Sequence, residues 1–497
     1  MAARFVNIDH DTPLLLPPDI RDWVGPDHMV HFIMDAVEAL DLSAARVNER
    51  GTGSAQYPPS MMLGLLIYCY ASGTFASRRI ETLTHENVAV RLLCADTHPD
   101  HDSICKFRRE NKALLSTAFH GVLELAAQAQ VLRVGDLTVS VDGTKVLANA
   151  SKHSAMSYDH LEKQMDLAEE QIAELLAKAE DADSTPLQDG LSIPEEIQRR
   201  EDRLAKLKEA KQAIEERAAQ RFEKEQAEHL EKLAEREAKE KASGKKPRGK
   251  KPKAPEEGPR PKDQYNFTDP ESRIMKDGGS FEQCYNAQAA VEVETMLIVG
   301  GEVSDAPNDK EQLEPALNSV SPTVGSVGKV LADSGYYSAK AVANVEDNGV
   351  GPTVYAATKR HPHGRNIRQL EQHADPPAPP DDAPAGEIMA HRLATEAGKA
   401  LYGLRKQTVE PAFGIIKEAM GFRRFLMRGL EKVNLEWTLV TTSYNPKHLF
   451  NLGMRIKGGR RASKAFRAAP AGRPSTSPSA KAPKASPEEL RRGPGRK

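Results

Sequence analysis

The segment that most constrains the fold is 137–142, an alternation of β-branched residues typical of a buried strand that runs into Asp142. A carboxylate at the end of a core strand is costly unless a partner offsets its charge. Residues 327–333 repeat the pattern, because an apolar strand ends there in Asp333 and a glycine turn follows. Functional groups in an open α/β sheet gather beyond the carboxyl ends of the strands. We therefore expect the two aspartates to face one crevice, although each taken singly is equally well explained as a turn residue.

A third acid, Glu410, lies on an amphipathic segment over 401–422 and shares a helical face with Lys417. Four apolar residues of this segment are placed to pack on the sheet: Val409, Phe413, Ile416 and Met420. Three clustered carboxylates repel one another, and a divalent cation would relieve that repulsion. All-oxygen ligation suits Mg²⁺ or Mn²⁺, and two such ions roughly 3.5–4 Å apart would polarise a phosphodiester.

Hydrophobic periodicity divides the chain into regions of different character. The apolar spacing is helical before residue 136, and a charged helical pattern broken by a loop at 181–194 follows the first strand. The strand at 137–142 cannot bury both faces alone, so it belongs with the later strands, and the helices between are an insertion. The predicted parts are a helical N-terminal domain over 1–135, a first core strand over 136–157, a helical hairpin over 158–243, a basic disordered linker over 244–264, the rest of a mixed α/β core over 265–454 and a basic disordered tail over 455–497.

The overall charge is close to neutral, with 69 Lys and Arg against 71 Asp and Glu. Nucleic-acid affinity must therefore come from local basic clusters, such as those in the linker and the tail. Four cysteines without CxxC pairing fit free thiols in a reducing cytoplasm. The longest apolar run, at 61–71, is far shorter than the roughly 20 residues of a membrane span, so we expect a soluble intracellular protein.

The polar segment at 98–111 is predicted to be a short helix with Asp102 or Ser103 as its N-cap. Its basic residues are Lys106, Arg108 and Arg109. They are equally well explained as DNA contacts or as a solvated helix face. The histidines and aspartates at 98–102 resemble a metal site, but capping and loop polarity explain them without a metal.

The chain resembles bacterial insertion-sequence transposases of the DDE type over most of residues 10–450. The resemblance rests on several segments: LPPDIRDWVGPDHMVHF, YPPSMMLGLLIYCYASG, SVDGTKVLANAS, DPESRIMK, YNAQAAV, LADSGYYS and VEPAFGIIK. It implies an RNase H-like catalytic core, an all-helical N-terminal domain, and Asp142, Asp333 and Glu410 as the metal-binding catalytic acids.

The family signature around the glutamate is Tyr, two residues, Arg, three residues, Glu, six residues, Lys. Tyr402, Arg405, Glu410 and Lys417 match it, except that four residues separate Arg405 from Glu410. Lys406 restores the usual gap, so either basic residue is a candidate for the DNA contact. Pro411 places Glu410 near a helix start, because proline is tolerated in the first turn of a helix.

The resemblance implies a DNA transposase that uses two Mg²⁺ or Mn²⁺ ions. Such an enzyme cuts at the ends of a mobile element and joins the freed 3′-hydroxyl to target DNA. The residues implied in contacts with phosphates are Lys145, Tyr402, Arg405, Lys406 and Lys417, and those implied in recognising the terminal inverted repeats are Lys106, Arg108 and Arg109. A homodimer on DNA, in the cytoplasm at the bacterial nucleoid, is expected because two element ends are processed together. The alternative is a catalytically inactive DNA-binding protein derived from a transposase. A phosphatase of the haloacid-dehalogenase type is disfavoured, because such enzymes need a pair of aspartates two residues apart and Ser140 stands at the other position.

Overall fold

The computed structural model describes residues 19–48, 55–182, 193–243, 249–358, 375–380 and 383–456. The predicted basic tail lies outside these residues apart from positions 455 and 456, and so does most of the predicted loop at 181–194.

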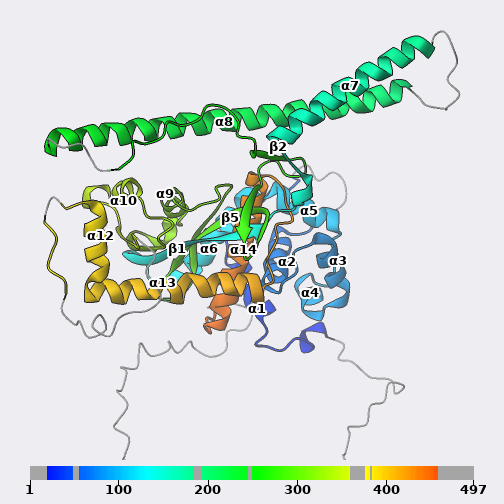
Figure 1. Cartoon of the computed structure of the whole chain (residues 1–497). Helices are drawn as coiled ribbons and strands as arrows, with labels where there is room; N and C mark the ends of the chain where they lie inside the picture. The colour runs from blue at the N-terminus through cyan, green and yellow to red at the C-terminus, as the bar shows by residue number, and fades with distance from the viewer. Residues whose placement is uncertain are drawn as a thin grey trace, which may run out of the picture. The chain divides into compact units, whose positions relative to one another are not determined.

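A mixed sheet of six strands lies at the centre of the fold (Figure 1). Its strands are β1 (Leu137–Leu147), β4 (Arg273–Asp277), β5 (Ser280–Glu292), β6 (Ile298–Ser304), β7 (Val327–Ala332) and β8 (Thr353–Ala356). The order is β4-β5-β1-β7-β8, and β6 pairs with the second half of β5. Strand β5 is antiparallel to β1, whereas β7 is parallel to β1 and β8 is parallel to β7. This arrangement confirms the predicted mixed α/β sheet, which is RNase H-like and flanked by helices.

Helices from the second half of the chain pack against this sheet. They are α9 (Leu313–Asn318), α10 (Ala339–Glu346), α12 (Ala385–Ala394), α13 (Glu396–Gly414) and α14 (Leu430–Asn451). Helix α13 begins after Thr395, whose side chain accepts a hydrogen bond from the Gly398 N–H, and it packs on β1, β5 and β7. The four apolar residues predicted to face the sheet are all buried, which confirms that part of the amphipathic pattern: Val409, Phe413, Ile416 and Met420.

The first part of the chain is helical, as predicted. Its helices are α1 (Met29–Glu38), α2 (Pro59–Ala71), α3 (Ser77–Glu86), α4 (Val88–Leu93), α5 (His101–Glu110) and α6 (Lys112–Gln128). Helix α14 packs on α1, α2 and α6 as well as on β6, so these helices and the sheet share one hydrophobic core. The apolar run at 61–71 is buried within α2. In the described ranges, no helix is long and apolar enough to cross a bilayer, and all four cysteines are free thiols.

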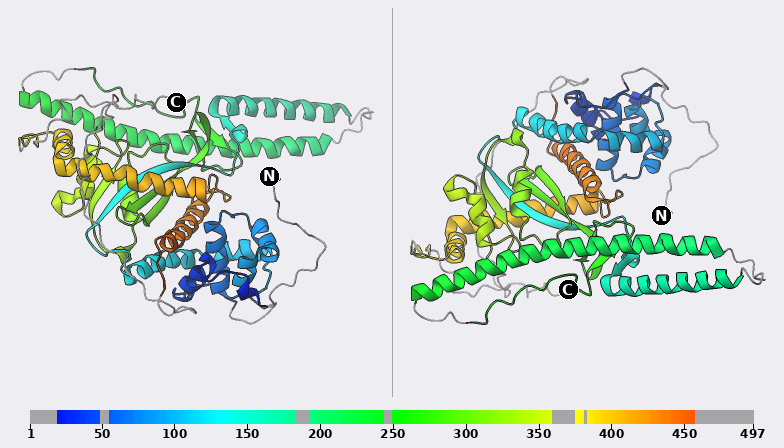
Figure 2. Two further views of the ribbon diagram at one scale, coloured as in Figure 1. Left: turned by 90° about the horizontal axis from the view of Figure 1, so that it is seen from below. Right: turned by 90° about the horizontal axis from the view of Figure 1, so that it is seen from above.

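The predicted insertion is a pair of helices, α7 (Tyr158–Ala182) and α8 (Ile193–Ser243), which lie side by side in all views (Figure 2). They have their own small core, made of Leu161, Leu207, Ala210, Ile214 and Tyr265. A two-stranded ribbon joins the pair to the rest of the chain, with β2 (Ala155–Ser157) antiparallel to β3 (Gln264–Asn266).

Within the predicted linker, residues 249–263 form no helix or strand, and Gln264 begins β3. This segment nevertheless contacts α8, where Arg221 Nη2 lies 2.9 Å from Asp263 Oδ2 and Arg236 Nη2 donates to the Gly249 carbonyl over 2.8 Å. Arginines of α8 thus supply hydrogen bonds to this segment's backbone and to its acid, while the disorder of the linker stays a prediction.

Candidate active site

Sheet register brings the two strand aspartates together. Strands β1 and β7 run parallel, and the last pair in their ladder is Val141 with Ala332. The next residue on each strand is therefore Asp142 on β1 and Asp333 after β7, and the two carboxylates are close enough to influence each other's charge. The expectation that both aspartates face one place is thus met by the geometry.

The prediction that β1 ends at Asp142 is wrong. The strand continues to Leu147, because β5 pairs with it as far as Leu147 and Cys284. Gly143 is therefore no turn residue. A Cβ atom on Gly143 would lie 2.4 Å from Gln288 Nε2 and 2.7 Å from Asp309 Oδ1, so this position needs glycine because neighbouring side chains approach its backbone closely.

Helix α13 brings Arg405 and Glu410 to the same place. Arg405 Nη1 lies 3.1 Å from Asp142 Oδ2, and Arg405 Nη2 lies 3.6 Å from Glu410 Oε1. The Arg405 side chain is 8% exposed, whereas that of Glu410 is 54% exposed. Lys406 is exposed. Of the two basic residues left open by the sequence, it is Arg405 that contacts the acids.

Glu410 does not sit at a helix start, as Pro411 had suggested. Helix α13 runs from Glu396 through Pro411 to Gly414, and a π-helical turn follows over Ile415–Ala419. Proline removes one backbone hydrogen bond from a helix interior. Burial of Val409 and Phe413 on the sheet offsets that loss and keeps the segment helical.

A fourth acid, Asp309, was not expected from the sequence. It lies between β6 and α9, and its Oδ1 accepts hydrogen bonds from Asn286 Nδ2 at 2.6 Å and Gln288 Nε2 at 2.9 Å. The buried Tyr336 hydroxyl donates to the other end of the Gln288 amide. The sequence does hold a signal, since two amides two residues apart lie on one face of an otherwise apolar strand. We call Asp142, Asp309, Asp333 and Glu410 the acid cluster.

Burial dominates the electrostatics of the acid cluster. It raises the pKa of Asp142 to about 6, against the opposing effect of Arg405, and Asp333 and Asp309 raise that pKa further. The anion of Asp142 is therefore destabilised relative to a carboxylate in water. A further cation at this place would stabilise it.

Two lysines and a tyrosine lie beside the acid cluster. Lys145 Nζ is 4.0 Å from Asp309 Oδ1, and Lys417 Nζ donates to the Lys145 carbonyl over 2.7 Å. Burial lowers the pKa of both lysines. Burial also raises the pKa of Tyr402, which lies near Arg405 and Asp333. The structure thus gathers Lys145, Tyr402 and Lys417 around the acids, and it leaves Lys406 at the surface.

The basic residues of α5 separate into two kinds. Lys106 and Arg109 are exposed, but Arg108 is buried, and its Nη1 donates to Tyr70 Oη over 2.7 Å and to the Phe75 carbonyl over 3.3 Å. The expectation that Arg108 contacts DNA is therefore wrong, because its guanidinium is held inside the helical region. The N-cap of α5 is Asp100, which accepts from the Ser103 N–H, rather than either residue predicted.

The histidines near α5 have partners of their own. His101 Nδ1 lies 2.8 Å from Glu81 Oε2, and the His98 ring stacks on His85 with centroids 3.9 Å apart. Over the described ranges, no three His, Cys, Asp or Glu side chains are arranged to hold a metal ion as they stand. At the acid cluster, the guanidinium of Arg405 lies between Asp142 and Glu410.

Comparison with known proteins finds two family models. Residues 250–445 match the model described as the transposase DDE domain, and residues 18–110 match the model described as a transposase domain (DUF772). The first match includes Asp333 and Glu410, whereas Asp142 precedes it and reaches the acid cluster through the β1–β7 register. No curated protein and no solved structure matches the chain.

Proposed function

The chain belongs to the DDE-type transposases of insertion sequences, and we propose that it cuts DNA at the ends of such an element and joins the freed 3′-hydroxyls to target DNA. The observation that supports this chemistry most strongly is the adjacency of Asp142 and Asp333, with Glu410 linked to Asp142 through Arg405. The substrate would be the terminal inverted repeats of the element. A homodimer on DNA follows from the need to process two ends together.

The donor atoms of the acid cluster fit a hard divalent cation. Asp142, Asp333 and Glu410 offer only carboxylate oxygens, which Mg²⁺ and Mn²⁺ prefer. Burial has already raised the pKa of Asp142 to about 6, so a cation there would be favoured electrostatically. We propose that Asp142 and Asp333 hold the ions and that Glu410 completes the set. When bound, such ions activate water or a 3′-hydroxyl and stabilise charge on the scissile phosphate.

The neighbouring basic residues would place the DNA. Lys145, Lys417 and Arg405 lie within or beside the acid cluster, so a phosphate brought to the acids would meet their positive charges. Tyr402 would border the same phosphate, and Lys406 would contact DNA from the exposed side of α13. In the helical N-terminal region, Lys106 and Arg109 remain candidates for contacts with the terminal repeats.

One observation favours a second candidate, a DNA-binding protein without catalytic activity. Arg405 donates to Asp142 and approaches Glu410, so a guanidinium stands where a metal would need the same oxygens. In an active enzyme Arg405 would have to release Asp142 and Glu410 before their oxygens could hold a metal ion. In an inactive derivative it would remain as the permanent counter-ion of the acids.

A cleavage and strand-transfer assay separates these two functions. The substrate is duplex DNA that carries the native element ends, taken from the inverted repeats on either side of the gene. We expect Mg²⁺-dependent cleavage by the wild type, and DNA binding without cleavage by Asp142→Ala. The matched control is Asp305→Ala, because Asp305 also follows a strand but pairs with Arg273 at 2.7 Å. Binding by the wild type without cleavage, with Mg²⁺ or Mn²⁺ present, would favour the inactive DNA-binding protein.

A further inference from the structure

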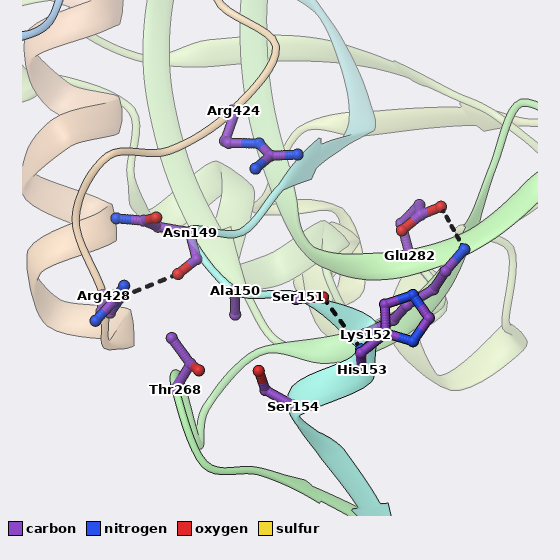
Figure 3. A pocket seen from close by; sticks show the side chains of 10 residues that line it. All are labelled: Asn149, Ala150, Ser151, Lys152, His153, Ser154, Thr268, Glu282, Arg424 and Arg428. Carbon is purple, nitrogen blue, oxygen red and sulfur yellow. Dashed lines mark hydrogen bonds and ion pairs between the residues drawn. The ribbon is translucent and has the colours of Figure 1, made fainter.

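A cavity of about 430 Å³ opens where the chain leaves β1 (Figure 3). Its lining is polar, and its charged side chains are mostly basic, with Lys152 and His153 from the short 3-10 helix after β1, and Arg424 and Arg428 from the segment between α13 and α14. In Figure 3, Arg428 and Lys152 lie on opposite sides of the hollow. Glu282 is the single acid in the lining.

The connector over 415–429, between α13 and α14, follows β1 from the acid cluster to this cavity. Backbone hydrogen bonds join the Leu147 N–H to the Arg423 carbonyl at 3.1 Å and the Phe425 N–H to the Leu147 carbonyl at 2.8 Å. Further along, Arg428 Nε donates to the Asn149 carbonyl over 2.9 Å. Because Lys417 binds the Lys145 carbonyl at the other end, basic side chains accompany the strand over this whole length.

Charges in the cavity are only partly neutralised. Lys152 Nζ pairs with Glu282 Oε1 at 2.9 Å. Arg424 is exposed, and its guanidinium has no hydrogen-bond or ion-pair partner among the described residues. The exposed Arg428 uses one nitrogen on a neutral carbonyl, which leaves its charge uncompensated. A ligand for this cavity should therefore carry negative charge and oxygen acceptors.

We propose that this cavity binds the sugar-phosphate backbone of the DNA whose scissile phosphate lies at the acid cluster. The inference rests on the proposed function. Asn149 follows Asp142 by seven positions along β1 and its exit, which corresponds to roughly 23 Å at about 3.3 Å per residue. One DNA strand carries a phosphate about every 3.4 Å, so the contacted phosphates lie about seven nucleotides from the scissile bond.

The test measures binding of the full-length protein to a duplex that carries one native element end, over a series of salt concentrations. The variant Arg424→Ala/Arg428→Ala should bind at least about tenfold more weakly, as expected for two lost charged hydrogen bonds. Its salt slope should fall by roughly 1.8, at about 0.9 for each phosphate contact. Ethylation interference should vanish at phosphates about seven nucleotides from the cut and persist at the scissile phosphate.

Control variants separate this role from a folding defect. Arg423→Ala removes the same charge one residue away, but Arg423 pairs with Glu418 outside the cavity, so the salt slope should stay at the wild-type value. Arg424→Ala alone removes a side chain without a hydrogen-bond partner among the described residues and should keep the wild-type unfolding temperature. Glu282→Gln should tighten DNA binding, because it frees the charge of Lys152, and loss of structure cannot produce that gain.

The outcomes are distinguishable. A wild-type protein that binds and cuts the element end, with a double variant that keeps its salt slope and interference pattern, overturns the cavity assignment and leaves the proposed function intact. A wild-type protein that neither binds nor cuts this DNA overturns both.

Discussion

Two buried arginines lie in different regions of this protein, and each has a carboxylate nearby. Arg108 belongs to the N-terminal helices and lies near Glu436 of α14, while Arg405 belongs to α13 and lies against Asp142. Each arginine is 7% exposed. The carboxylates differ, because Glu436 is fully buried and its Oε2 accepts from the backbone N–H groups of Leu426 and Met427, at 2.9 and 3.0 Å.

The acids at Arg405 are open to solvent by comparison. The Asp142 side chain is 21% exposed and that of Glu410 is 54% exposed. Arg108 and Glu436 are held by fixed protein groups, although Arg108 Nε and Glu436 Oε1 have no hydrogen-bond partner among the described residues. The pair of Asp142 and Arg405 is reached by solvent and lies beside further acids. A metal ion can therefore replace the guanidinium of Arg405 as the cation next to Asp142. We infer that the Arg108 region holds α14 in place and that the Arg405 region is where the chemistry occurs.

A substitution at Asp142 tests whether the chemistry occurs in the Arg405 region. Asp142→Asn should lower Mg²⁺-dependent cleavage of element-end DNA by at least about a thousandfold, corresponding to roughly 4 kcal/mol of transition-state stabilisation. The unfolding temperature should change little, because the substitution keeps the shape and removes a disfavoured charge. Rates are measured in single turnover. Cleavage at the wild-type rate would remove Asp142 from the chemistry.

A substitution at Glu436 tests whether the Arg108 region stabilises the fold. Glu436→Gln should lower the free energy of unfolding by about 3 kcal/mol, because it removes the carboxylate whose charge stabilises the buried guanidinium of Arg108. The activity of the protein that remains folded should equal that of the wild type. Chemical denaturation measures the first quantity, and active-site titration corrects the second. A stable variant with reduced cleavage per folded molecule would reverse the roles assigned to the two regions.

Arg405→Gln tests whether its guanidinium competes with metal for the acid cluster. Mn²⁺ affinity in the absence of DNA should rise about tenfold, because a positive charge next to Asp142 is removed. Cleavage should nevertheless fall, since a contact with the DNA phosphate is lost. Calorimetric titration with Mn²⁺ provides the measurement, and Arg392→Gln, which removes a pair with Glu346 away from the acids, is the control. Weaker Mn²⁺ binding by the variant would identify Arg405 as a positioning residue for the acids.

The affinity for Mn²⁺ should depend weakly on pH. The pKa of Asp142 is raised to about 6, so protons compete with metal below that pH and cease to compete above it. Mn²⁺ binding should therefore be about fourfold weaker at pH 5.5 than at pH 7, and nearly constant above pH 7. Asp309→Asn should shift this dependence to lower pH, because Asp309 is one of the acids that raise the Asp142 pKa. An affinity independent of pH between 5.5 and 7 would contradict a role for Asp142 as a ligand.

Sequence patterns predicted the acids better than they predicted the surroundings of the acids. Period-two alternation identified the strands that carry Asp142 and Asp333, and the structure shows that these strands are neighbours. Helical periodicity predicted that Val409 and Phe413 pack on the sheet, where they are buried. Local sequence patterns contain no information about contacts with residues distant in the sequence. The continuation of β1 to Leu147 depends on β5, more than a hundred residues away in the chain.

The same limitation explains the residues that were misjudged. The sequence around Arg108 is typical of a surface cation, but in the structure Arg108 donates to Tyr70. The sequence around Asp309 is typical of a loop, but in the structure Asp309 accepts hydrogen bonds from two amides of β5. In both cases the decisive contact joins separate elements of the fold. The irregular match of Arg405 to the family signature shows the same limit, because the contact of Arg405 with Asp142 is visible only in three dimensions.

The proposed chemistry requires that Asp142, Asp333 and Glu410 bind the same divalent ions. Replacing Mg²⁺ by Fe²⁺ and adding ascorbate and peroxide generates hydroxyl radicals at the bound ion, which cut the nearby polypeptide backbone. If the three acids bind the same ions, cuts will appear close to residues 142, 333 and 410 together, and they will be suppressed by excess Mg²⁺ and lost in Asp142→Ala. Cuts confined to other parts of the chain, or cuts near residue 333 that survive in Asp142→Ala, would contradict binding of the same ions by the three acids.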